Sequence, residues 1–379
     1  MKLTKAIVAL EPMQPLHTNW SLQDVSVGVP GEGEVLVEIC ATGICHTDIL
    51  LSAVPAGTFG ISYPKVVGHE GSGIVRAIGP NIKNISVGDP VLMSYHSCSS
   101  CNQCRNSHPA YCDSFAVENY VGQSTSMTLN RTGEAIHSRF FGQSSFSRYS
   151  VVSEKSIVNI RGLLHDEMEL KLFAPLGCGF QTGMGAVCNT SNAGPSDSVM
   201  IIGLGAVGMG ALMAAKIRNC AMIIAVDRVD SRLEEATALG ANHTINTATL
   251  GSRALSDAVQ SLTPGGPSIV IDTAGAPVVL EEALESMQQR GKLVLIGVPP
   301  LGYKLPLNVI THINKGHLII GCIEGDCIPS KSIPQMITWY REGLFPIDKL
   351  VQYYKITDYE EAVAQLKKGA VVKPVLTWE

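Results

Sequence analysis

Length, composition and charge limit the classes to which this protein can belong. The chain has 379 residues, of which 45% are hydrophobic and 16% charged, a balance typical of globular proteins and sufficient for two domains with separate cores. The formal net charge of −5 gives no basic field for binding nucleic acid. No stretch approaches the ~20 apolar residues that span a bilayer.

The N-terminus and the cysteines indicate where the protein works. The first apolar run soon meets Glu11 and Pro12, which makes it too short for a secretory signal. Cysteines number eleven, an odd total, and four of them fall within residues 98–112, a pattern that suits thiolate metal ligation better than a disulfide framework. We therefore expect a soluble protein of the reducing cytoplasm, with no membrane partner.

The first part of the chain is predicted to be mostly β. Residues 1 to about 160 are rich in Val, Ile, Gly and Pro, and the runs 34–39 and 73–79 have the apolar character of strands between turns. Two loops in this region carry polar side chains, at 43–48 (Gly-Ile-Cys-His-Thr-Asp) and at 67–73 (Val-Gly-His-Glu-Gly-Ser-Gly). Taken alone, the first of these loops is equally consistent with a simple turn.

Four cysteines follow in the pattern Cys98-x2-Cys101-x2-Cys104-x7-Cys112. Four thiolates at such short spacing can close a tetrahedral zinc site with no open position, which is typical of structural zinc. An iron–sulfur cluster and unligated buried thiols remain open alternatives, because spacing does not exclude iron. Nothing else in the chain indicates electron transfer.

A further cysteine, Cys178, lies in the glycine-rich segment 175–183. Together with Cys45 and His69 it offers two thiolates and one imidazole, a ligand set suited to Zn²⁺ that leaves one coordination position for water or substrate. Sequence separation says nothing about spatial closeness, so this triad is a hypothesis.

The region after residue 183 alternates regularly between strand-like and helix-like runs. A parallel, six-stranded, doubly wound sheet is predicted, with nearly continuous apolar strands because both faces are covered. The strand-like runs are 198–203, 222–227, 268–273 and 292–297, with weaker ones near 243–246 and 317–321, and the helix-like runs are 207–218, 230–239 and 277–289.

The first of these strands ends in Gly203-x-Gly205-x-x-Gly208 and runs directly into a helix. Glycines at this junction allow a tight turn and the close approach of a pyrophosphate to the helix N-terminus. The next strand ends in Asp227, 19 residues after Gly208, near the ~20 expected of a ribose-binding acid. The alternative is that the glycines serve only helix–sheet packing and that Asp227 caps the following helix.

These motifs together resemble the zinc-dependent medium-chain alcohol dehydrogenase family over essentially the whole chain. Segments 321–326 and 345–351 resemble its aryl-alcohol (benzyl-alcohol) branch less specifically. The resemblance implies an α/β protein with a GroES-like, mostly-β catalytic domain (1–180), a doubly wound, parallel-sheet Rossmann domain that binds NAD (181–322) and a return to the catalytic domain (323–379). It also implies two zinc ions per chain and a homodimer or homotetramer.

Roles are carried over from the family position by position. Cys45, His69 and Cys178 would bind the catalytic zinc and the four-cysteine lobe the structural zinc, while Asp48 would orient His69 and Glu70 would sit behind the metal. Thr47 would hydrogen-bond the substrate oxygen. His46 and Lys373 would contact the pyrophosphate of the cofactor, and Thr182 and Val207 its nicotinamide. The loop of Gly203, Gly205 and Gly208 would also contact the cofactor, and Asp227 and Arg232 would lie at its adenosine.

The sequence departs from the best-known members at two positions. Leu50 stands where those enzymes carry a proton-relay histidine, and Ser94 where an aromatic residue often lines the substrate pocket, although Phe140 and Phe141 offer aromatic walls from elsewhere.

The expected reaction is hydride transfer between NAD(H) and an alcohol/aldehyde pair, the alcohol being primary and aromatic or allylic. The alternatives are 1,4-reduction of a conjugated carbonyl or iminium, suggested by the missing relay histidine, and a non-catalytic dinucleotide sensor, which would have no need of an open zinc triad.

Overall fold

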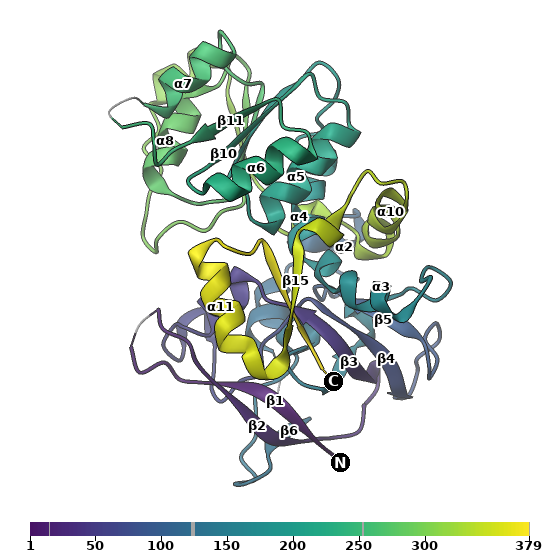
Figure 1. Ribbon diagram of the computed structural model, residues 1–379. Coiled ribbons are helices and arrows are strands. Elements are labelled where there is room, and N and C mark those ends of the chain that lie inside the picture. The colour runs from purple at the N-terminus through teal and green to yellow at the C-terminus, as the bar shows by residue number, and fades with distance from the viewer. Residues whose placement is uncertain (15, 123–125, 252–253, 379) are drawn as a thin grey trace. The chain divides into compact units, whose positions relative to one another are not determined.

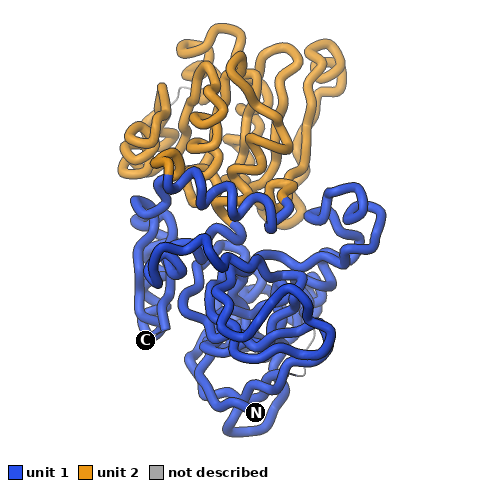
Figure 2. Tube along the Cα trace, turned by 90° about the vertical axis from the view of Figure 1, so that its right-hand side faces the viewer, with its two compact units in different colours: residues 1–178, 328–341, 346–379 blue, residues 179–327, 342–345 orange. Residues whose placement is uncertain are grey.

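The computed structural model describes residues 1–14, 16–122, 126–251 and 254–378. Figure 1 shows its helices and strands. The chain forms two compact units, coloured blue and orange in Figure 2. Unit 1 consists of residues 1–178, 328–341 and 346–379, and unit 2 of residues 179–327 and 342–345. The chain therefore leaves unit 1 after Cys178 and returns to it at Ile328.

Unit 1 is built mainly from antiparallel strands in two sheets, with the orders β1-β2-β6 and β15-β16-β3-β4-β5-β8; strand β7 pairs with β3. Strand β3 alternates buried Val35, Val37 and Ile39 with partly exposed residues, the pattern of a strand with one buried face. The strands are β1 (Lys2–Leu10), β2 (Asn19–Val27), β3 (Glu34–Gly43), β4 (Gly71–Ile78), β5 (Pro90–Met93), β6 (Met127–Leu129), β7 (Tyr149–Ser153), β8 (Ile157–Asn159), β15 (Val351–Lys355) and β16 (Lys373–Thr377).

Helices in unit 1 are short and lie between its strands. The longest helix that the structure describes, α10, has 13 residues. No helix in the described part of the chain combines the length and the apolar character needed to cross a membrane. The helices of this unit are α1 (His46–Leu51), α2 (Asn102–Arg105), α3 (Glu167–Leu172), α10 (Pro329–Arg341) and α11 (Tyr359–Lys368).

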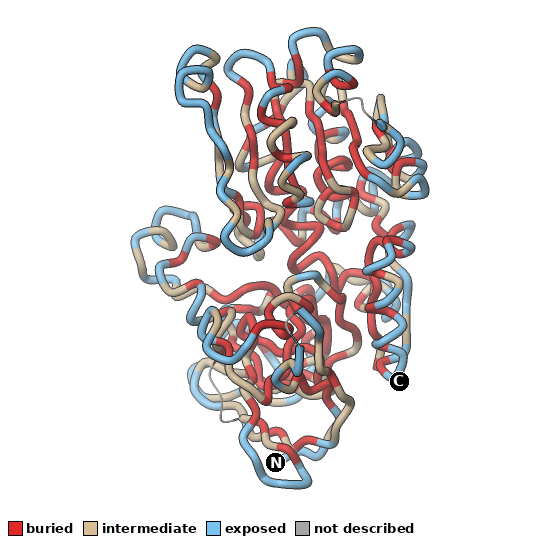
Figure 3. Tube along the Cα trace, turned by 90° about the vertical axis from the view of Figure 1, so that its left-hand side faces the viewer, coloured by how far each residue is buried: buried red, intermediate tan, exposed pale blue. Residues whose placement is uncertain are grey.

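Unit 2 contains the predicted parallel sheet of six strands, in the order β11-β10-β9-β12-β13-β14. Its central strands are buried almost throughout (Figure 3), as expected of a sheet covered on both faces. The strands are β9 (Ser198–Ile202), β10 (Met222–Asp227), β11 (His243–Asn246), β12 (Ile269–Asp272), β13 (Lys292–Leu295) and β14 (Leu318–Gly321).

The helices of unit 2 agree with the prediction in part. Helices α5 and α6 match the predicted runs closely, whereas α8 ends at Ser286 instead of residue 289 because Met287 has an extended backbone, with ψ 144°. Three further helices, α4, α7 and α9, were not predicted. The helices are α4 (Gly179–Gly185), α5 (Ala206–Ile217), α6 (Asp230–Leu239), α7 (Leu255–Leu262), α8 (Pro277–Ser286) and α9 (Val309–Lys315).

Candidate functional site

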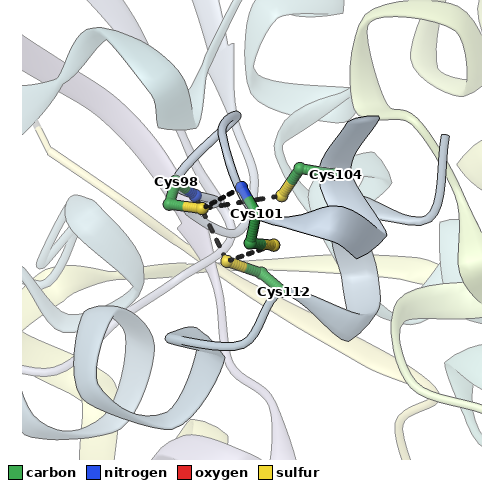
Figure 4. Close-up of side chains that lie close together, drawn as sticks. All are labelled: Cys98, Cys101, Cys104 and Cys112. Atoms are coloured by element: carbon green, nitrogen blue, oxygen red, sulfur yellow. Dashed lines mark hydrogen bonds between the residues drawn. The ribbon is translucent and has the colours of Figure 1, made fainter. Parts of the chain in front are cut away.

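Four cysteine side chains meet around α2 in unit 1 (Figure 4). The sulfurs of Cys98, Cys101, Cys104 and Cys112 lie within 4.8 Å of one another. The Sγ–Sγ distance is 3.9 Å between Cys98 and Cys104 and 4.0 Å between Cys101 and Cys112. A disulfide requires about 2.05 Å, whereas a zinc tetrahedron with arms of ~2.3 Å has edges of about 3.8 Å. The spacing therefore fits four thiolates around one metal ion.

Electrostatics in this cluster also favour a cation. Backbone N–H groups of Ser100 and Cys101 donate to Cys98 Sγ at 3.4 and 3.3 Å, and such hydrogen bonds, led by that of Ser100, lower the pKa of Cys98 to about 5. Burial and the neighbouring sulfur of Cys101 instead raise the pKa of Cys104 to about 12. Four adjacent thiolates repel one another unless a cation compensates their charge, so these residues fit a closed zinc site.

A second cluster of metal-type ligands lies beside α1. Cys45, His69, Glu70 and Cys178 place ligand atoms within 4.8 Å of one another. Cys45 immediately precedes α1, His69 and Glu70 immediately precede β4, and Cys178 is the last residue before the chain enters unit 2. Gly43 permits this arrangement, because a Cβ there would collide with the carboxylate of Glu70.

The imidazole of His69 is held in one orientation by Asp48. Its Nδ1 lies 2.7 Å from Oδ1 of Asp48, and both side chains are fully buried. Asp48 also accepts hydrogen bonds from the backbone N–H groups of Cys45 and Gly68, at 2.9 and 3.0 Å. Burial alone would lower the pKa of His69, but the charge and hydrogen bond of Asp48 outweigh it and raise that pKa well above its usual range.

The other ring nitrogen of His69, Nε2, is buried and has no hydrogen-bond partner among the described residues. A buried ring nitrogen without a partner is costly unless it has a ligand. The neighbouring thiol of Cys178 lowers the pKa of Cys45 well below its usual range, and His69 acts in the same direction against the effect of burial. An imidazole nitrogen beside two sulfurs, one of them readily ionised, fits a zinc ion.

Glu70 and Lys373 form a buried ion pair at this cluster. The ammonium of Lys373 lies 2.8 Å from both carboxylate oxygens of Glu70 and donates to the carbonyl of Ile44 at 3.2 Å. Burial lowers the pKa of Lys373, but Glu70 outweighs it and raises that pKa; Glu70 likewise has a raised pKa because of burial. Lys373 is thus placed beside the metal ligands, and its predicted contact with a pyrophosphate stays a prediction.

The first turn of α1 carries the predicted substrate and cofactor contacts. The hydroxyl of Thr47 lies 3.7 Å from Sγ of Cys45, so it is adjacent to the metal-ligand cluster. His46 is exposed and Leu50 half-buried. No acid–base group occupies position 50, as the sequence implies.

An aromatic cluster packs around His69. The ring of Phe141 stacks on the imidazole at a centroid distance of 4.4 Å, and the ring of Phe140 meets it edge-on at 5.7 Å. Phe115 and Tyr120 contact Phe141 at 6.2 and 5.8 Å. Phe140 and Phe141 are only 0% and 2% exposed, so they pack against His69, and their suggested role as walls of a substrate pocket stays a prediction.

The three glycines of the dinucleotide motif have three different environments in unit 2. Gly203 has a positive φ of 85°, which a side chain disfavours. A Cβ at Gly208 would collide with the carbonyl of Gly203, whereas one at Gly205, directly before α5, would meet open space. In Rossmann folds, the three glycines allow a tight turn, close packing of the helix, and room for a ligand at the helix N-terminus.

Asp227 ends β10 beside this loop. One carboxylate oxygen accepts the backbone N–H of Leu204 at 2.7 Å, and the other accepts those of Arg228 and Val229 at 2.7 and 3.0 Å. Arg232 lies 3.9 Å from the first oxygen. The carboxylate is therefore fixed at the end of its strand, next to the glycine loop.

Thr182 and Val207 lie on helices that touch. A Cβ at Gly183 would collide with the carbonyl of Val207, and one at Gly210 would lie 2.7 Å from the carbonyl of Phe180. Glycines on both helices thus allow α4 and α5 to pack backbone against backbone, which brings the elements carrying these two predicted nicotinamide contacts together.

One residue of the metal centre was not anticipated from sequence. The amide of Gln143 donates to the carbonyls of His69 and Ser94, at 2.8 and 3.1 Å, and accepts the N–H of Gly71 at 3.1 Å. It joins three segments around the His69 loop. A glutamine in a polar stretch carries no motif, so no sequence signal marks it.

Comparison with known proteins agrees with this geometry. Residues 31–162 match the alcohol dehydrogenase GroES-like domain, and residues 206–342 match the zinc-binding dehydrogenase domain. A geraniol dehydrogenase from Castellaniella defragrans is 33% identical over 361 residues, which cover 94% of each chain.

Two solved structures are similar along their whole length. An alcohol dehydrogenase zinc-binding domain protein from Burkholderia ambifaria is 37% identical with a TM-score of 0.92, covering 100% of this chain and 99% of the other. The benzyl alcohol dehydrogenase from Acinetobacter calcoaceticus is 36% identical with a TM-score of 0.90, covering 100% of both chains.

A dinucleotide-type sheet in one unit, with a closed and an open set of zinc-type ligands in the other, defines a metal-dependent dehydrogenase. The chain belongs to the zinc-dependent medium-chain alcohol dehydrogenase family, whose cofactors are zinc and NAD(H). The resemblance noted from the sequence motifs, including that to the benzyl-alcohol branch, is confirmed.

Proposed function

We propose that this protein transfers a hydride reversibly between a primary alcohol and NAD⁺. The observation that carries the proposal is the buried Nε2 of His69, which lacks a hydrogen-bond partner among the described residues and lies in one cluster with the sulfurs of Cys45 and Cys178. Two thiolates and an imidazole are a catalytic zinc set, because they leave one position for substrate.

The metal ligands in this proposal are Cys45, His69 and Cys178 for the catalytic zinc and the four-cysteine cluster for the structural zinc. Bound zinc supplies a Lewis acid and bound NAD⁺ the hydride acceptor. Asp48 holds the Nδ1 proton of His69 and so directs the Nε2 lone pair toward the ligand cluster. Glu70, neutralised by Lys373, sits behind the metal.

Thr47 takes the first step in proton release. Its hydroxyl, 3.7 Å from Cys45 Sγ, hydrogen-bonds the substrate oxygen and accepts its proton as the alcohol is oxidised. Leu50 cannot receive that proton, so Thr47, together with a ribose hydroxyl, would hand it to water or to a base outside the motif.

The cofactor-binding part of the proposal divides the chain into a catalytic domain, 1–180 with 323–379, and an NAD-binding domain, 181–322. The open space at Gly205 suits the pyrophosphate, and the fixed carboxylate of Asp227 suits the ribose hydroxyls. The proposed cofactor contacts are His46, Thr182, Gly203, Gly205, Val207, Gly208, Asp227, Arg232 and Lys373.

We expect NAD⁺ to be preferred over NADP⁺. The charge of Asp227 would face the 2′-phosphate of NADP⁺, and bringing like charges together costs several kcal/mol, equivalent to about a hundredfold or more. Arg228, directly after Asp227, is exposed and is the competing consideration, because its guanidinium could accommodate the phosphate. The measurement is kcat/KM for both cofactors in the wild type, in Asp227→Asn, which removes the charge, and in Arg228→Gln. Asp227→Asn should reduce the ratio of kcat/KM with NAD⁺ to that with NADP⁺. A wild type with the higher kcat/KM for NADP⁺ would contradict the role given to Asp227.

We expect benzyl and cinnamyl alcohol to be better substrates than ethanol. An aryl group offers on the order of 100 Å² more apolar surface, and at about 25 cal/mol per Å² its burial corresponds to nearly a hundredfold in kcat/KM at most. The similarity to a benzyl alcohol dehydrogenase and a geraniol dehydrogenase supports this expectation. Steady-state assays with each alcohol and NAD⁺ test it, and equal or higher kcat/KM for ethanol would refute it.

The product formed from cinnamaldehyde distinguishes the proposed carbonyl reduction from 1,4-reduction. Reduction of its carbonyl gives cinnamyl alcohol, whereas reduction of its double bond gives the saturated aldehyde. Product analysis with NADH should yield the unsaturated alcohol.

The proposed setting is the cytoplasm, with the protein as a homodimer or homotetramer acting on small alcohols and aldehydes. None of the eleven cysteines forms a disulfide, which suits a reducing compartment.

A further inference from the structure

Lys65 is buried inside unit 1 without a compensating carboxylate. It is 0% exposed and is among the largest fully buried side chains. Its ammonium donates to the carbonyl of Val121 at 2.6 Å and lies 5.6 Å from the centroid of the Phe140 ring, within cation–π range. Burial lowers its pKa to about 7, and within the described residues no carboxylate acts against that effect.

This placement is costly. An ion removed from water without a counter-ion destabilises the folded state, and an aliphatic side chain of similar volume is usually better tolerated. The backbone of Lys65 is bound to β1 through both its N–H and its carbonyl, paired with Ala9 at 2.8 and 2.7 Å. These backbone bonds are independent of the side chain, so the strand geometry does not require a lysine.

Both contacts of the ammonium lead to the aromatic cluster around His69. Val121 ends the helical turn η3 (Val117–Val121), which also carries Tyr120. Phe140 begins the turn η4 (Phe140–Gly142), and its ring contacts the imidazole of His69 directly. Lys65 therefore joins the two turns whose rings surround the proposed zinc ligand.

Other contacts also hold the two turns: the hydroxyl of Ser156 donates to the carbonyl of Phe141 at 3.0 Å, and the amide of Asn119 bonds the backbone of His96 at 2.8 and 3.0 Å. Arg139 and Phe141 have left-handed backbones, with φ 65° and 54°, a conformation that non-glycine residues adopt only where the surroundings hold them. A hydrogen bond from an ammonium to the carbonyl that ends η3 and a cation over the first ring of η4 are two such restraints.

We propose that Lys65 is a positioning residue for substrate selection: its ammonium fixes η3 and η4 and thereby sets the preference for aromatic over small alcohols. This inference rests on the proposed function. Lys65 touches neither the zinc ligands nor substrate, so it acts through Val121 and the aromatic cluster.

Other titratable groups lie on the elements that pack around Lys65. Burial and the charge of Lys65 lower the pKa of His137, which lies on the segment bridged to Lys65. The remaining charged groups have partners of their own: Lys5 of β1 with Asp24, Arg139 before η4 with Glu34, and Glu118 of η3 with His96. Burial raises the pKa of Tyr63, two positions before Lys65, to about 12, so its phenol is neutral over the pH range of the experiment.

The experiment measures the ratio of kcat/KM for benzyl alcohol to that for ethanol between about pH 6 and pH 8.5. Proton release from the alcohol affects both substrates alike and cancels in the ratio. In the wild type the ratio should fall about threefold to tenfold as Lys65 loses its charge. In Lys65→Met it should be low and independent of pH. Lys65→Gln, which retains a donor for Val121 but no charge, should be intermediate and equally flat.

His137→Gln is the matched control and should retain the pH-dependent ratio of the wild type. A wild-type ratio that does not change with pH, or a Lys65→Met ratio that still does, would overturn the proposal. If neither alcohol is oxidised at any pH, the proposed function itself fails, whereas turnover of both with a flat ratio removes only the role of Lys65.

Thermal unfolding gives a second readout. The pKa of Lys65 is about 7 in the folded protein and 10.5 in the unfolded chain. Between these values the unfolded chain binds a proton that the folded protein does not, so the stability contributed by this group rises with pH and its cost is greatest below about pH 7. Lys65→Met should therefore raise Tm at about pH 6, and the gain should shrink by about pH 9.

Discussion

Replacing Cys45 with serine is expected to lower kcat for alcohol oxidation by at least about a thousandfold and to leave a folded protein with one zinc ion fewer. Lewis-acid stabilisation of the developing charge is worth several kcal/mol, and a serine hydroxyl is a poor substitute for a thiolate whose pKa is already lowered by Cys178. Metal analysis, circular dichroism and kcat on the same preparation provide the measurement.

Cys40→Ser is the matched control. Cys40 lies on β3, upstream of Cys45, and burial raises the pKa of its thiol, so it is an inert cysteine. It should change neither zinc content nor kcat. A Cys45→Ser protein that keeps two zinc ions and normal turnover would refute the assignment of the catalytic ligands.

Replacing Cys101 with serine is expected to act mainly on stability. Its sulfur is one of four in a closed site, and loss of one ligand from such a site exposes three mutually repelling thiols and releases the metal. We expect Tm to fall by about 5 °C or more, with kcat at low temperature largely kept. Thermal unfolding with and without a chelator measures this.

Cys220→Ser serves as the control for Cys101→Ser, because Cys220 follows α5 in unit 2 and belongs to neither cluster. Wild-type protein should be colourless and contain two zinc ions per chain. A brown protein with visible absorption would indicate an iron–sulfur cluster, and a single zinc ion per chain would exclude one of the two sites.

The sheet of unit 2 could be predicted from sequence because most of its strands are short, nearly continuous apolar runs. Helix α9 could not be, since it has only seven residues and none of them is buried. Helix α7 does bury Leu255 and Val259 in the core below the sheet, but eight residues are too few for a clear helical period.

The two metal-ligand clusters also differ in how far the sequence predicts them. The four-cysteine cluster is local in sequence, and its spacing predicts it. The second set depends on contacts over long separations: Lys373 meets Glu70 across 303 positions, and the residue types alone could offer the grouping of Cys45 with Cys178 only as a hypothesis. Nothing in the sequence indicates that Lys65 is buried, because a lysine in a loop is normally exposed and the burial of this one follows from tertiary packing alone.

The position of β16 has a consequence for biosynthesis. This last strand pairs with β3 beside Gly43, Ile44 donates its N–H to the carbonyl of Pro374 at 3.0 Å, and Lys373 neutralises Glu70. Ribosomes deliver the chain from its N-terminus, so all of unit 2 is made before the strand that secures the Cys45 loop exists. We therefore expect zinc capture at this site to await synthesis of β16, and removal of residues 373–378 to act as a defect in metal loading.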